Sequence, residues 1–199
     1  MSAYLYIEGG GDSKELRARC REGFRRLLER CDLAGRMPRL VAGGGRSSTY
    51  DDFKTAHRLA AEGNYVGMLV DSEDTVRDAE QTWAHLQQRD GWDKPQGADD
   101  GQVLMMVTCS ETWIVTDREA LRSHYGADLQ ESALPPRNDM ESRNRESIQS
   151  ALVRATRNCK NAYGKGKRSF AVIARLAPER LRDCLPSFAR CERILSERL

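Results

Sequence analysis

Three carboxylates, those of Asp71, Glu73 and Asp74, directly follow the apolar run YVGMLV. Near the start of the chain another short apolar run is followed by Glu8 and three glycines. Burying unpaired carboxylates is costly, so acids at strand ends usually face solvent, a metal ion or a catalytic cleft. If the two ends are neighbours in the fold, Glu8, Asp71 and Glu73 form a hard-oxygen site that suits Mg²⁺.

Further carboxylates can join this site or compete for it. Residues two apart on an extended strand point to the same side, so alternation favours Glu73 over Asp74 as the partner of Asp71. If the chain turns at once into a helix, Asp74 is an N-cap instead. Asp12 is either a metal ligand or a helix cap. Glu111 follows another apolar run by a few residues, and it either reaches the metal cluster or pairs with an arginine.

The basic side chains are concentrated in the last third of the chain. The formal net charge of the 199 residues is only +2, but residues 71–136 carry a net charge of −9 and residues 137–199 one of +8. Between Ser147 and Pro178 there are seven basic residues and no acid. This distribution favours a metal-holding segment followed by a polyanion-binding one. The alternative is a set of solvated helix faces that balance each other.

Five basic side chains are candidates for contacts with a phosphate backbone. Most lie in or near a Gly-rich turn, and one follows three glycines at the end of an apolar run: they are Lys160, Lys165, Lys167, Arg168 and Arg46. Lys165 is also placed to neutralise charge that develops during phosphoryl transfer. A solvated basic loop is the competing interpretation. The glycines before Arg46 lack the GxxxxGK[ST] spacing of a nucleotide-binding loop, although N–H groups ahead of a helix can hold an anion.

The composition limits the class of protein. A chain of 199 residues suits one domain with a proper core. The six cysteines form no CxxC pair and no zinc-type spacing, which indicates reduced thiols. The N-terminal residues do not resemble a signal peptide, and no apolar run approaches the roughly 18 residues of a membrane span. We therefore expect a cytoplasmic protein without membrane contact.

Alternating apolar and amphipathic segments position the candidate residues. The expected strands and the helices between them cover residues 3–7, 38–42, 65–70 and 103–108, and about 12–31, 47–61 and 75–89. This alternation predicts an α/β fold with a mainly parallel four-stranded sheet and helices on both faces. Ligands of such sheets bind beyond the carboxyl ends of the strands, where the acids stand.

The remaining residues predict helices with little strand character. We expect a short helix around Glu111, another at about 118–125, one ending near residue 159, and two or three terminal helices interrupted at Pro178 and Pro186. We place a boundary after residue 126, between an α/β core of residues 1–126 and a basic helical extension of residues 127–199. The extension is expected to pack on the core as one compact unit.

Two sequence patterns resemble a known family. A strand ending in Glu8-Gly9, followed by one ending in Asp71-x-Glu73, resembles the toprim fold of topoisomerases, primases and the nucleases of the overcoming-lysogenization-defect group. A cysteine-x-Glu-x-Trp pattern followed by Asp and Ala-Leu, at residues 109–121, is similar to a segment of a bacterial toprim-like family, domain of unknown function 4276. The likeness covers most of the chain.

The resemblance implies a Rossmann-like toprim fold and a nuclease that hydrolyses phosphodiester bonds with Mg²⁺ or Mn²⁺. It implies catalytic roles for Glu8, Asp71 and Glu73, and the basic turn adds Lys165 as a candidate that assists them. The resemblance further implies a bacterial setting in anti-phage defence or on a mobile element, with a separately encoded ATPase as partner. It does not decide between DNA and RNA as substrate, and a homo-oligomer stays open.

Two departures from the family pattern favour a second hypothesis. The family usually has a glutamate where this chain has Asp12, and the toprim pair is usually Asp-x-Asp rather than Asp71-x-Glu73. Because Glu73 is one methylene longer than the usual ligand, it fits the strict octahedral geometry of Mg²⁺ less readily. The alternative is a non-catalytic toprim-scaffold subunit that binds nucleic acid or a partner ATPase.

Overall fold

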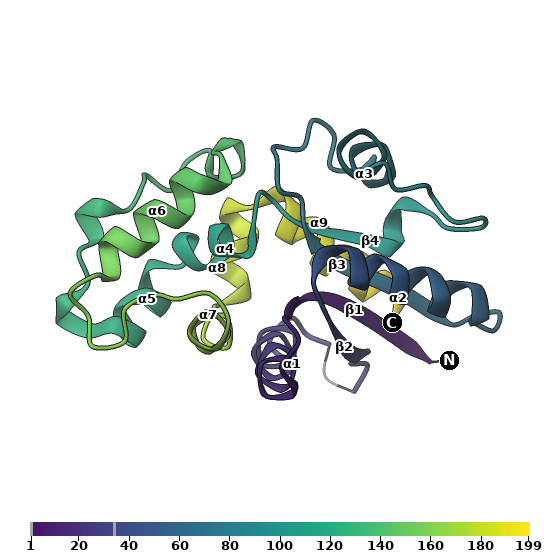
Figure 1. Ribbon diagram of the computed structural model, residues 1–199, viewed down its shortest axis with the longest axis horizontal. Helices are drawn as coiled ribbons and strands as arrows, with labels where there is room; N and C mark the ends of the chain where they lie inside the picture. Colours follow the sequence, from purple (N-terminus) through teal and green to yellow (C-terminus); the bar gives the residue numbers. More distant parts are fainter. Residues whose placement is uncertain (1, 34) are drawn as a thin grey trace.

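A parallel sheet forms the centre of the molecule. The computed structural model describes residues 2–33 and 35–199. The sheet has four parallel strands in the order β2-β1-β3-β4 (Figure 1). Their bounds are Ala3–Gly10 for β1, Arg39–Gly44 for β2, Tyr65–Asp71 for β3 and Val103–Met106 for β4. The predicted α/β fold with a parallel four-stranded sheet is confirmed.

The register of the two central strands brings their acids to one edge of the sheet. β1 and β3 are hydrogen-bonded neighbours, and Ile7 pairs with Leu69. On the other side of β3, Asp71 pairs with Met106. Because the strands are parallel, the residues that follow Ile7 and Val70 emerge at the same carboxyl edge. The position of Glu8 beside Asp71 is therefore a direct consequence of strand order and register.

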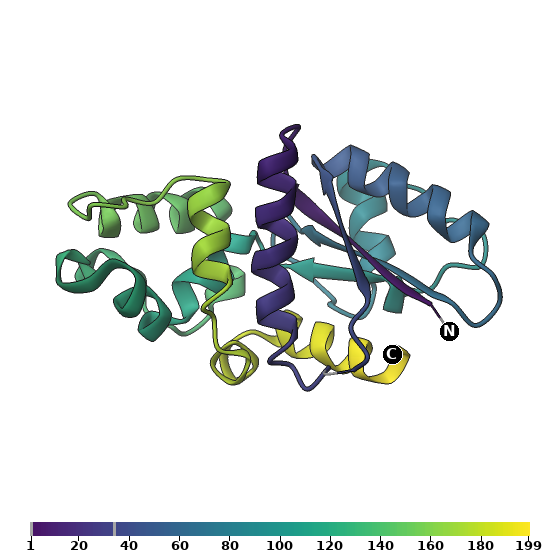
Figure 2. The same ribbon diagram turned by 90° about the horizontal axis from the view of Figure 1, so that it is seen from below.

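Helices cover both faces of the sheet, so β3 is buried along its whole length. On one face lie α1 (Lys14–Leu28) and α9 (Pro186–Arg198); on the other lie α2 (Arg46–Leu59) and α3 (Thr82–Asp90) (Figures 1 and 2). Alternate residues of β3 separate the two layers of core. Leu69 packs with the α1 and α9 side, whereas Met68 and Val70 pack with the α2 and α3 side.

Five helices gather beyond the carboxyl edge of the sheet (Figure 1). They are α4 (Ser110–Thr116), α5 (Arg118–Tyr125), α6 (Arg145–Thr156), α7 (Lys167–Ile173) and α8 (Pro178–Cys184). Single 3-10 turns occur at Asp100–Gln102, Gly126–Asp128, Glu131–Ala133 and Met140–Ser142. Pro178 and Pro186 are the first residues of α8 and α9, where the missing N–H costs nothing. The boundary placed after residue 126 stays a prediction.

One predicted helix is much shorter than expected. The segment 75–89 was expected to be helical throughout, but α3 begins only at Thr82. Two sets of contacts hold the preceding residues as a loop. The Asp78 carboxylate accepts the Glu80 N–H at 2.9 Å, and Glu80 is paired with Arg190 at 3.1 Å. These side-chain contacts compete with helical hydrogen bonds, as short polar residues commonly do.

The other bounds differ from the expected ones by a few residues. α1 starts after Ser13, whose hydroxyl accepts the Leu16 N–H at 3.3 Å as an N-cap. β1 continues through Gly10, and β4 ends at Met106. Within residues 2–33 and 35–199, no helix is both long enough and apolar enough to cross a membrane.

Candidate metal centre

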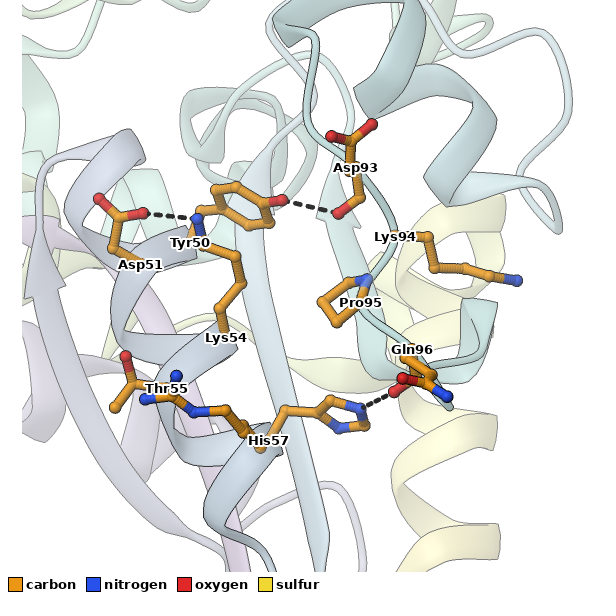
Figure 3. Close-up of a pocket in the computed structure, with 10 residues that line it drawn as sticks. Tyr50, Asp51, Lys54, Thr55, His57, Asp93, Lys94, Pro95 and Gln96 are labelled. Atoms are coloured by element: carbon orange, nitrogen blue, oxygen red, sulfur yellow. Dashed lines mark hydrogen bonds and ion pairs between the residues drawn. The ribbon is translucent and has the colours of Figure 1, made fainter.

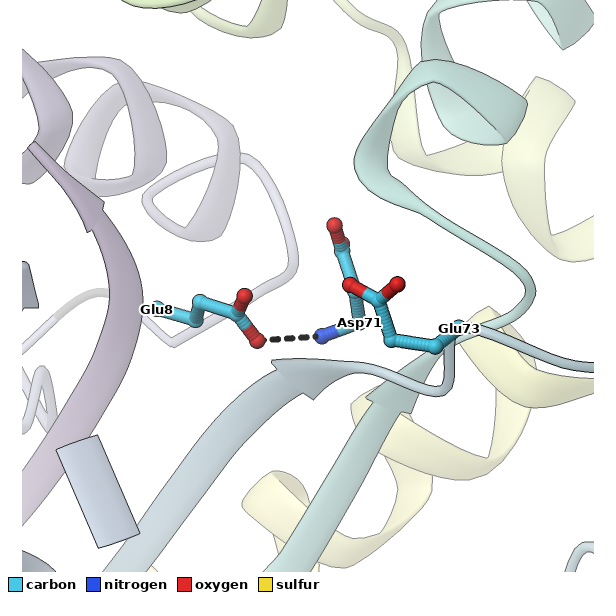
Figure 4. Close-up of side chains that lie close together, drawn as sticks. All are labelled: Glu8, Asp71 and Glu73. Carbon is cyan, nitrogen blue, oxygen red and sulfur yellow. Dashed lines mark hydrogen bonds between the residues drawn. The ribbon is translucent and has the colours of Figure 1, made fainter. Parts of the chain in front are cut away.

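Three carboxylates meet at the carboxyl edge of the sheet. Glu8 lies in β1, Asp71 is the last residue of β3, and Glu73 follows two residues later. One carboxylate oxygen from each of the three lies within 4.8 Å of the other two. Figure 4 shows the three side chains close together. Carboxylates at this spacing repel one another unless a cation lies between them.

The backbone at Glu73 is held in an uncommon conformation. Its φ of +68° lies in the left-handed region, which costs a residue with a side chain of the order of 1 kcal/mol or more. The Ser72 and Glu73 N–H groups donate to Met106 O at 3.0 Å and to Thr108 O at 2.8 Å. These bonds fix the segment after β3. Glu73 therefore joins Asp71 through a turn, and not through the extended alternation expected from the sequence.

Asp71 is the most buried of the three acids. Its Oδ1 accepts the Ser110 N–H at 2.8 Å, and its own N–H donates to Glu8 Oε2 at 3.1 Å. Burial raises the pKa of Asp71 to about 8; the Glu8 and Glu111 charges act in the same direction, and Lys165 opposes them.

Each of the three carboxylates has one oxygen left over. Glu8 Oε1, Asp71 Oδ2 and Glu73 Oε1 accept no hydrogen bond and form no ion pair with any residue within 2–33 and 35–199. Three carboxylates with spare oxygens are the donor set that Mg²⁺ and Mn²⁺ prefer. The residues present therefore fit a hard divalent cation.

Arg46, the first residue of α2, contacts the cluster directly. Its Nη1 donates to Glu8 Oε2 at 3.3 Å and to Asp71 O, and its Nη2 donates to Asp90 Oδ2 at 2.6 Å. The guanidinium also lies 4.8 Å from the ring centroid of Trp92. From the sequence we placed Arg46 on a phosphate backbone. In the structure it is engaged with the acids, and only 14% of its side chain is exposed.

Asp74 lies outside the cluster. Its side chain is 70% exposed and pairs with Arg89 at 3.1 Å. It does not cap α3, which starts eight residues later. Arg89 also pairs with Glu73, at 3.6 Å, and Arg145 of α6 contacts Glu73 as well.

The two remaining acidic candidates have different positions. Asp12 is exposed in the turn before α1, where Ser13 provides the cap, so the structure does not bring it to the other acids. Glu111 is fully buried in the first turn of α4. It pairs with no arginine among the described residues; instead it accepts from Tyr163 Oη at 2.5 Å and from Gln149 Nε2 at 3.3 Å.

A cavity of about 320 Å³ opens beside the cluster. Glu8, Asp71 and Glu111 line it together with Lys165, and the three glycines 9–11 form part of its wall. No side chain fits at Gly10, because a Cβ there would lie 2.7 Å from the Arg17 backbone. The three carboxylates and one cation of this cavity come from segments far apart in the sequence.

Lys165 is the one basic candidate that lines this cavity. Lys160 is exposed on the preceding turn. Lys167 lies 3.9 Å from Glu15, and Arg168 donates to Ala162 O at 2.6 Å. The predicted basic loop is thus present, but it presents a single side chain to the acids.

A larger cavity, of about 790 Å³, lies elsewhere (Figure 3). It opens between α2 and the segment 93–96, and no residue predicted for the site lines it. Tyr50 Oη donates to Asp93 O at 2.6 Å there, and Lys54 pairs with Asp51 at 2.9 Å. Among the described residues, the only close group of potential metal ligands lies at the sheet edge and not in this cavity, so the acidic cluster remains the better candidate for chemistry.

One comparison with known proteins confirms the family noted in the sequence, whereas the toprim relationship stays a prediction. The family model described as Domain of unknown function (DUF4276) matches residues 7–195, and the chain belongs to this family. No curated protein matches the chain, and no solved structure does. The match covers every residue of the cluster and of the cavity beside it.

Proposed function

We propose that this protein is a divalent-metal-dependent nuclease in which Glu8, Asp71 and Glu73 hold Mg²⁺ or Mn²⁺. One observation carries the proposal: three carboxylates from neighbouring parallel strands gather within 4.8 Å at the carboxyl edge of the sheet. Hard oxygen donors suit these ions. The carboxyl edge is also where open α/β sheets bind their ligands.

The chain's own residues would share the work of phosphodiester hydrolysis. A divalent ion, when bound, polarises a phosphoryl oxygen and activates water for attack. Lys165 lies on the same cavity and would balance the charge that develops on the phosphate. Glu8 Oε1, which accepts no hydrogen bond from the described chain, is free to hold a proton or a ligand.

The toprim resemblance supports nucleic acid as the substrate. It rests on Glu8-Gly9 at the end of one strand and Asp71-x-Glu73 at the end of its neighbour. With it comes the setting that we propose, a cytoplasmic anti-phage defence effector that acts with a separately encoded ATPase. The acid-free basic segment between Ser147 and Pro178 supports a polyanionic substrate, DNA or RNA.

Cleavage of defined substrates tests the proposal. Plasmid, single-stranded DNA and tRNA would be incubated with Mn²⁺ or Mg²⁺, with and without candidate ATPase partners. We expect metal-dependent cutting that EDTA stops and that Glu8→Gln abolishes. Asp74→Asn is the matched control, because Asp74 neighbours the cluster without belonging to it. Unaltered cutting by Glu8→Gln would remove Glu8 from the mechanism.

A second candidate is a non-catalytic scaffold subunit, and one observation favours it. Three arginines contact the cluster: Arg46 pairs with Glu8, and both Arg89 and Arg145 pair with Glu73. A cluster neutralised in this way has less need of a metal ion.

A thermal-shift titration with Mn²⁺ separates the two candidates. Metal that binds only the folded state raises the melting temperature as its concentration rises. We expect this rise in the wild type and not in Asp71→Asn. An equal response of the two proteins would favour the scaffold.

A further inference from the structure

A groove of about 620 Å³ runs between α1 and α7. The two helices lie side by side next to the carboxyl edge of the sheet (Figures 1 and 2). They approach closely because of Gly23: a Cβ there would lie 2.7 Å from Phe170 O. Alanines contribute to the lining from both helices, Ala18 from α1 and Ala171 and Ala174 from α7. The groove therefore has small side chains between its charged ones.

The charged side chains of this groove are mainly basic. Four basic residues line it against two acids. Arg19 and Arg26 come from α1, Lys167 from the start of α7 and Arg175 from just beyond its end, and the acids are Glu15 and Glu22. Arg19 pairs with Glu15 at 2.9 Å and Arg26 with Glu22 at 2.6 Å, and all of these side chains are more than 40% exposed. Exposed ion pairs of this kind are weak, so the arginines can exchange a carboxylate for a phosphate.

The groove adjoins the cavity at the metal centre. Phe170 lines both of them. Lys167, the first residue of α7, lines the groove, and Lys165, two residues earlier in the chain, lines the cavity. A ligand held at Lys167 therefore lies close to the lysine beside the carboxylates. The groove thus differs from an ordinary solvated helix face by having a buried acidic site as its neighbour.

We infer that this groove binds the backbone of single-stranded nucleic acid and leads it into the metal centre, an inference that rests on the proposed function. The cavity of about 320 Å³ lies at the small end of ligand sites, which span roughly 300–1,000 Å³. That volume suits one unpaired nucleotide unit.

The groove would hold the backbone and would not read the bases. Arg19 and Arg26 are seven residues apart, so they span about 10 Å along α1. Phe170 is only 8% exposed and offers little surface for stacking. Binding is therefore expected to depend strongly on salt and weakly on sequence.

Oligonucleotide binding in EDTA tests the inference without any cleavage. The probe is a fluorescein-labelled 12-nucleotide oligothymidylate, followed by anisotropy over a range of salt concentrations. Each phosphate contact with a single strand contributes about −0.7 to the slope of log K against log salt. Arg19→Gln with Arg26→Gln should lower the affinity roughly tenfold and reduce the slope by about 1.4. Lys167→Gln with Arg175→Gln provides a second, independent variant on α7.

The control removes the same charge from the far side of the sheet. Arg58 and Lys94 are exposed and line the cavity near α2. Arg58→Gln with Lys94→Gln should bind the probe like the wild type. Circular dichroism of every variant checks that the helices are intact.

The outcomes test nucleic-acid binding in the groove separately from the proposed nuclease activity. Weaker binding by both groove variants, with the control unchanged, supports the groove even if no cleavage is ever seen. Wild-type affinity in both groove variants would overturn it even if metal-dependent cleavage is confirmed. Tighter binding of a 12-base-pair duplex, or equal competition by an oligoglutamate of similar length, would also overturn it.

Discussion

Buried acids occur in two regions of the molecule, and the two regions treat them differently. In the helical group, Asp117 is fully buried and both of its oxygens are used. Oδ1 accepts the Ala120 N–H at 3.0 Å and so caps α5, and Oδ2 accepts the Ala177 N–H at 2.8 Å. Arg180 adds a cation at 3.4 Å. This carboxylate joins segments that are far apart in the sequence.

At the sheet edge, Asp71 is almost as buried as Asp117 but has fewer hydrogen-bond donors around its carboxylate. It accepts one hydrogen bond from a described residue, the Ser110 N–H, and faces the carboxylates of Glu8 and Glu73. Burial therefore does not distinguish a functional acid from a structural one. The number of hydrogen-bond donors distinguishes the two kinds of acid. A lone carboxylate with several donors stabilises the fold, whereas carboxylates that face one another need a further cation.

The largest expected effect is the loss of cleavage activity when the acid at the sheet edge is replaced. Asp71→Asn should reduce metal-dependent cleavage roughly 10³-fold, the scale seen when a charge-stabilising group is removed from an active site. Its melting temperature should not fall, because the substitution removes a buried carboxyl whose charged form is disfavoured by burial and by the neighbouring acids. Cleavage rates and calorimetry on the same preparation measure both quantities. A large loss of stability would mean that Asp71, like Asp117, is mainly structural.

The next largest effect is expected for Asp117→Asn, which should lower stability and leave activity unchanged. An asparagine there presents an amide to one of the two buried N–H groups and leaves Arg180 without its buried partner. Breaking a buried pair costs about 3–5 kcal/mol, or roughly 6–20 °C in melting temperature for a chain of this size. Cleavage per folded molecule should be unchanged.

Glu119→Gln is the matched control for Asp117→Asn. Glu119 also pairs with Arg180, but its side chain is 57% exposed. The control should shift the melting temperature by only a degree or two, since exposed pairs contribute little. Equal losses in the two variants would show that Arg180 alone, and not the donors around Asp117, accounts for the effect.

The contrast also shows what the sequence could predict. Apolar runs that end in acids, with helices between them, were enough to place Glu8 and Asp71 on one edge, because parallel strands share their carboxyl ends. The same reasoning could not separate Asp117 from Glu111, since both lie near Trp113 in the sequence. The folded structure separates them, because Asp117 accepts the Ala120 and Ala177 N–H groups, whereas Glu111 lines the cavity at the metal centre.

Partners of the site residues were harder to predict than the residues themselves. Arg46 binds Asp90, 44 positions away, and Tyr163 binds Glu111 across 52 positions. No local pattern marks such pairs, because they depend on how loops and helix ends meet after the chain has folded. Asp90 was missed for this reason.

Glu111 could be a structural acid like Asp117 or a functional one like Asp71, and Tyr163→Phe should distinguish the two roles. The substitution removes a donor from a buried carboxylate, which costs about 1–3 kcal/mol and lowers the melting temperature by several degrees. Tyr125→Phe is the control, because the Tyr125 hydroxyl is buried without a partner among the described residues. A stability loss confined to Tyr163→Phe would align Glu111 with Asp117. Unchanged stability with reduced cleavage would instead align it with the cluster.

The smallest effect concerns the pH dependence of stability and a half-buried acid, Glu141, which lies away from the cluster. Burial raises the pKa of Glu141, and the Ser187 N–H and hydroxyl, at 3.0 and 2.5 Å, partly oppose this. The folded state therefore holds the Glu141 proton more tightly than the unfolded chain does. The stability gained in this way is complete below the unfolded pKa and is lost as the pH rises through the folded pKa.

Glu141→Gln removes this titration while it keeps the size of the side chain. The melting temperature of the variant relative to the wild type should therefore increase from pH 4 to pH 7, by a few degrees at most. Any constant cost of the amide, which does not titrate, cancels in that difference. A relative melting temperature that stays level or falls over the same range would mean that Ser187 stabilises the Glu141 carboxylate more than burial penalises it. Glu141 would then match Asp117 in having its charge fully compensated, and the contrast with Asp71 would become sharper.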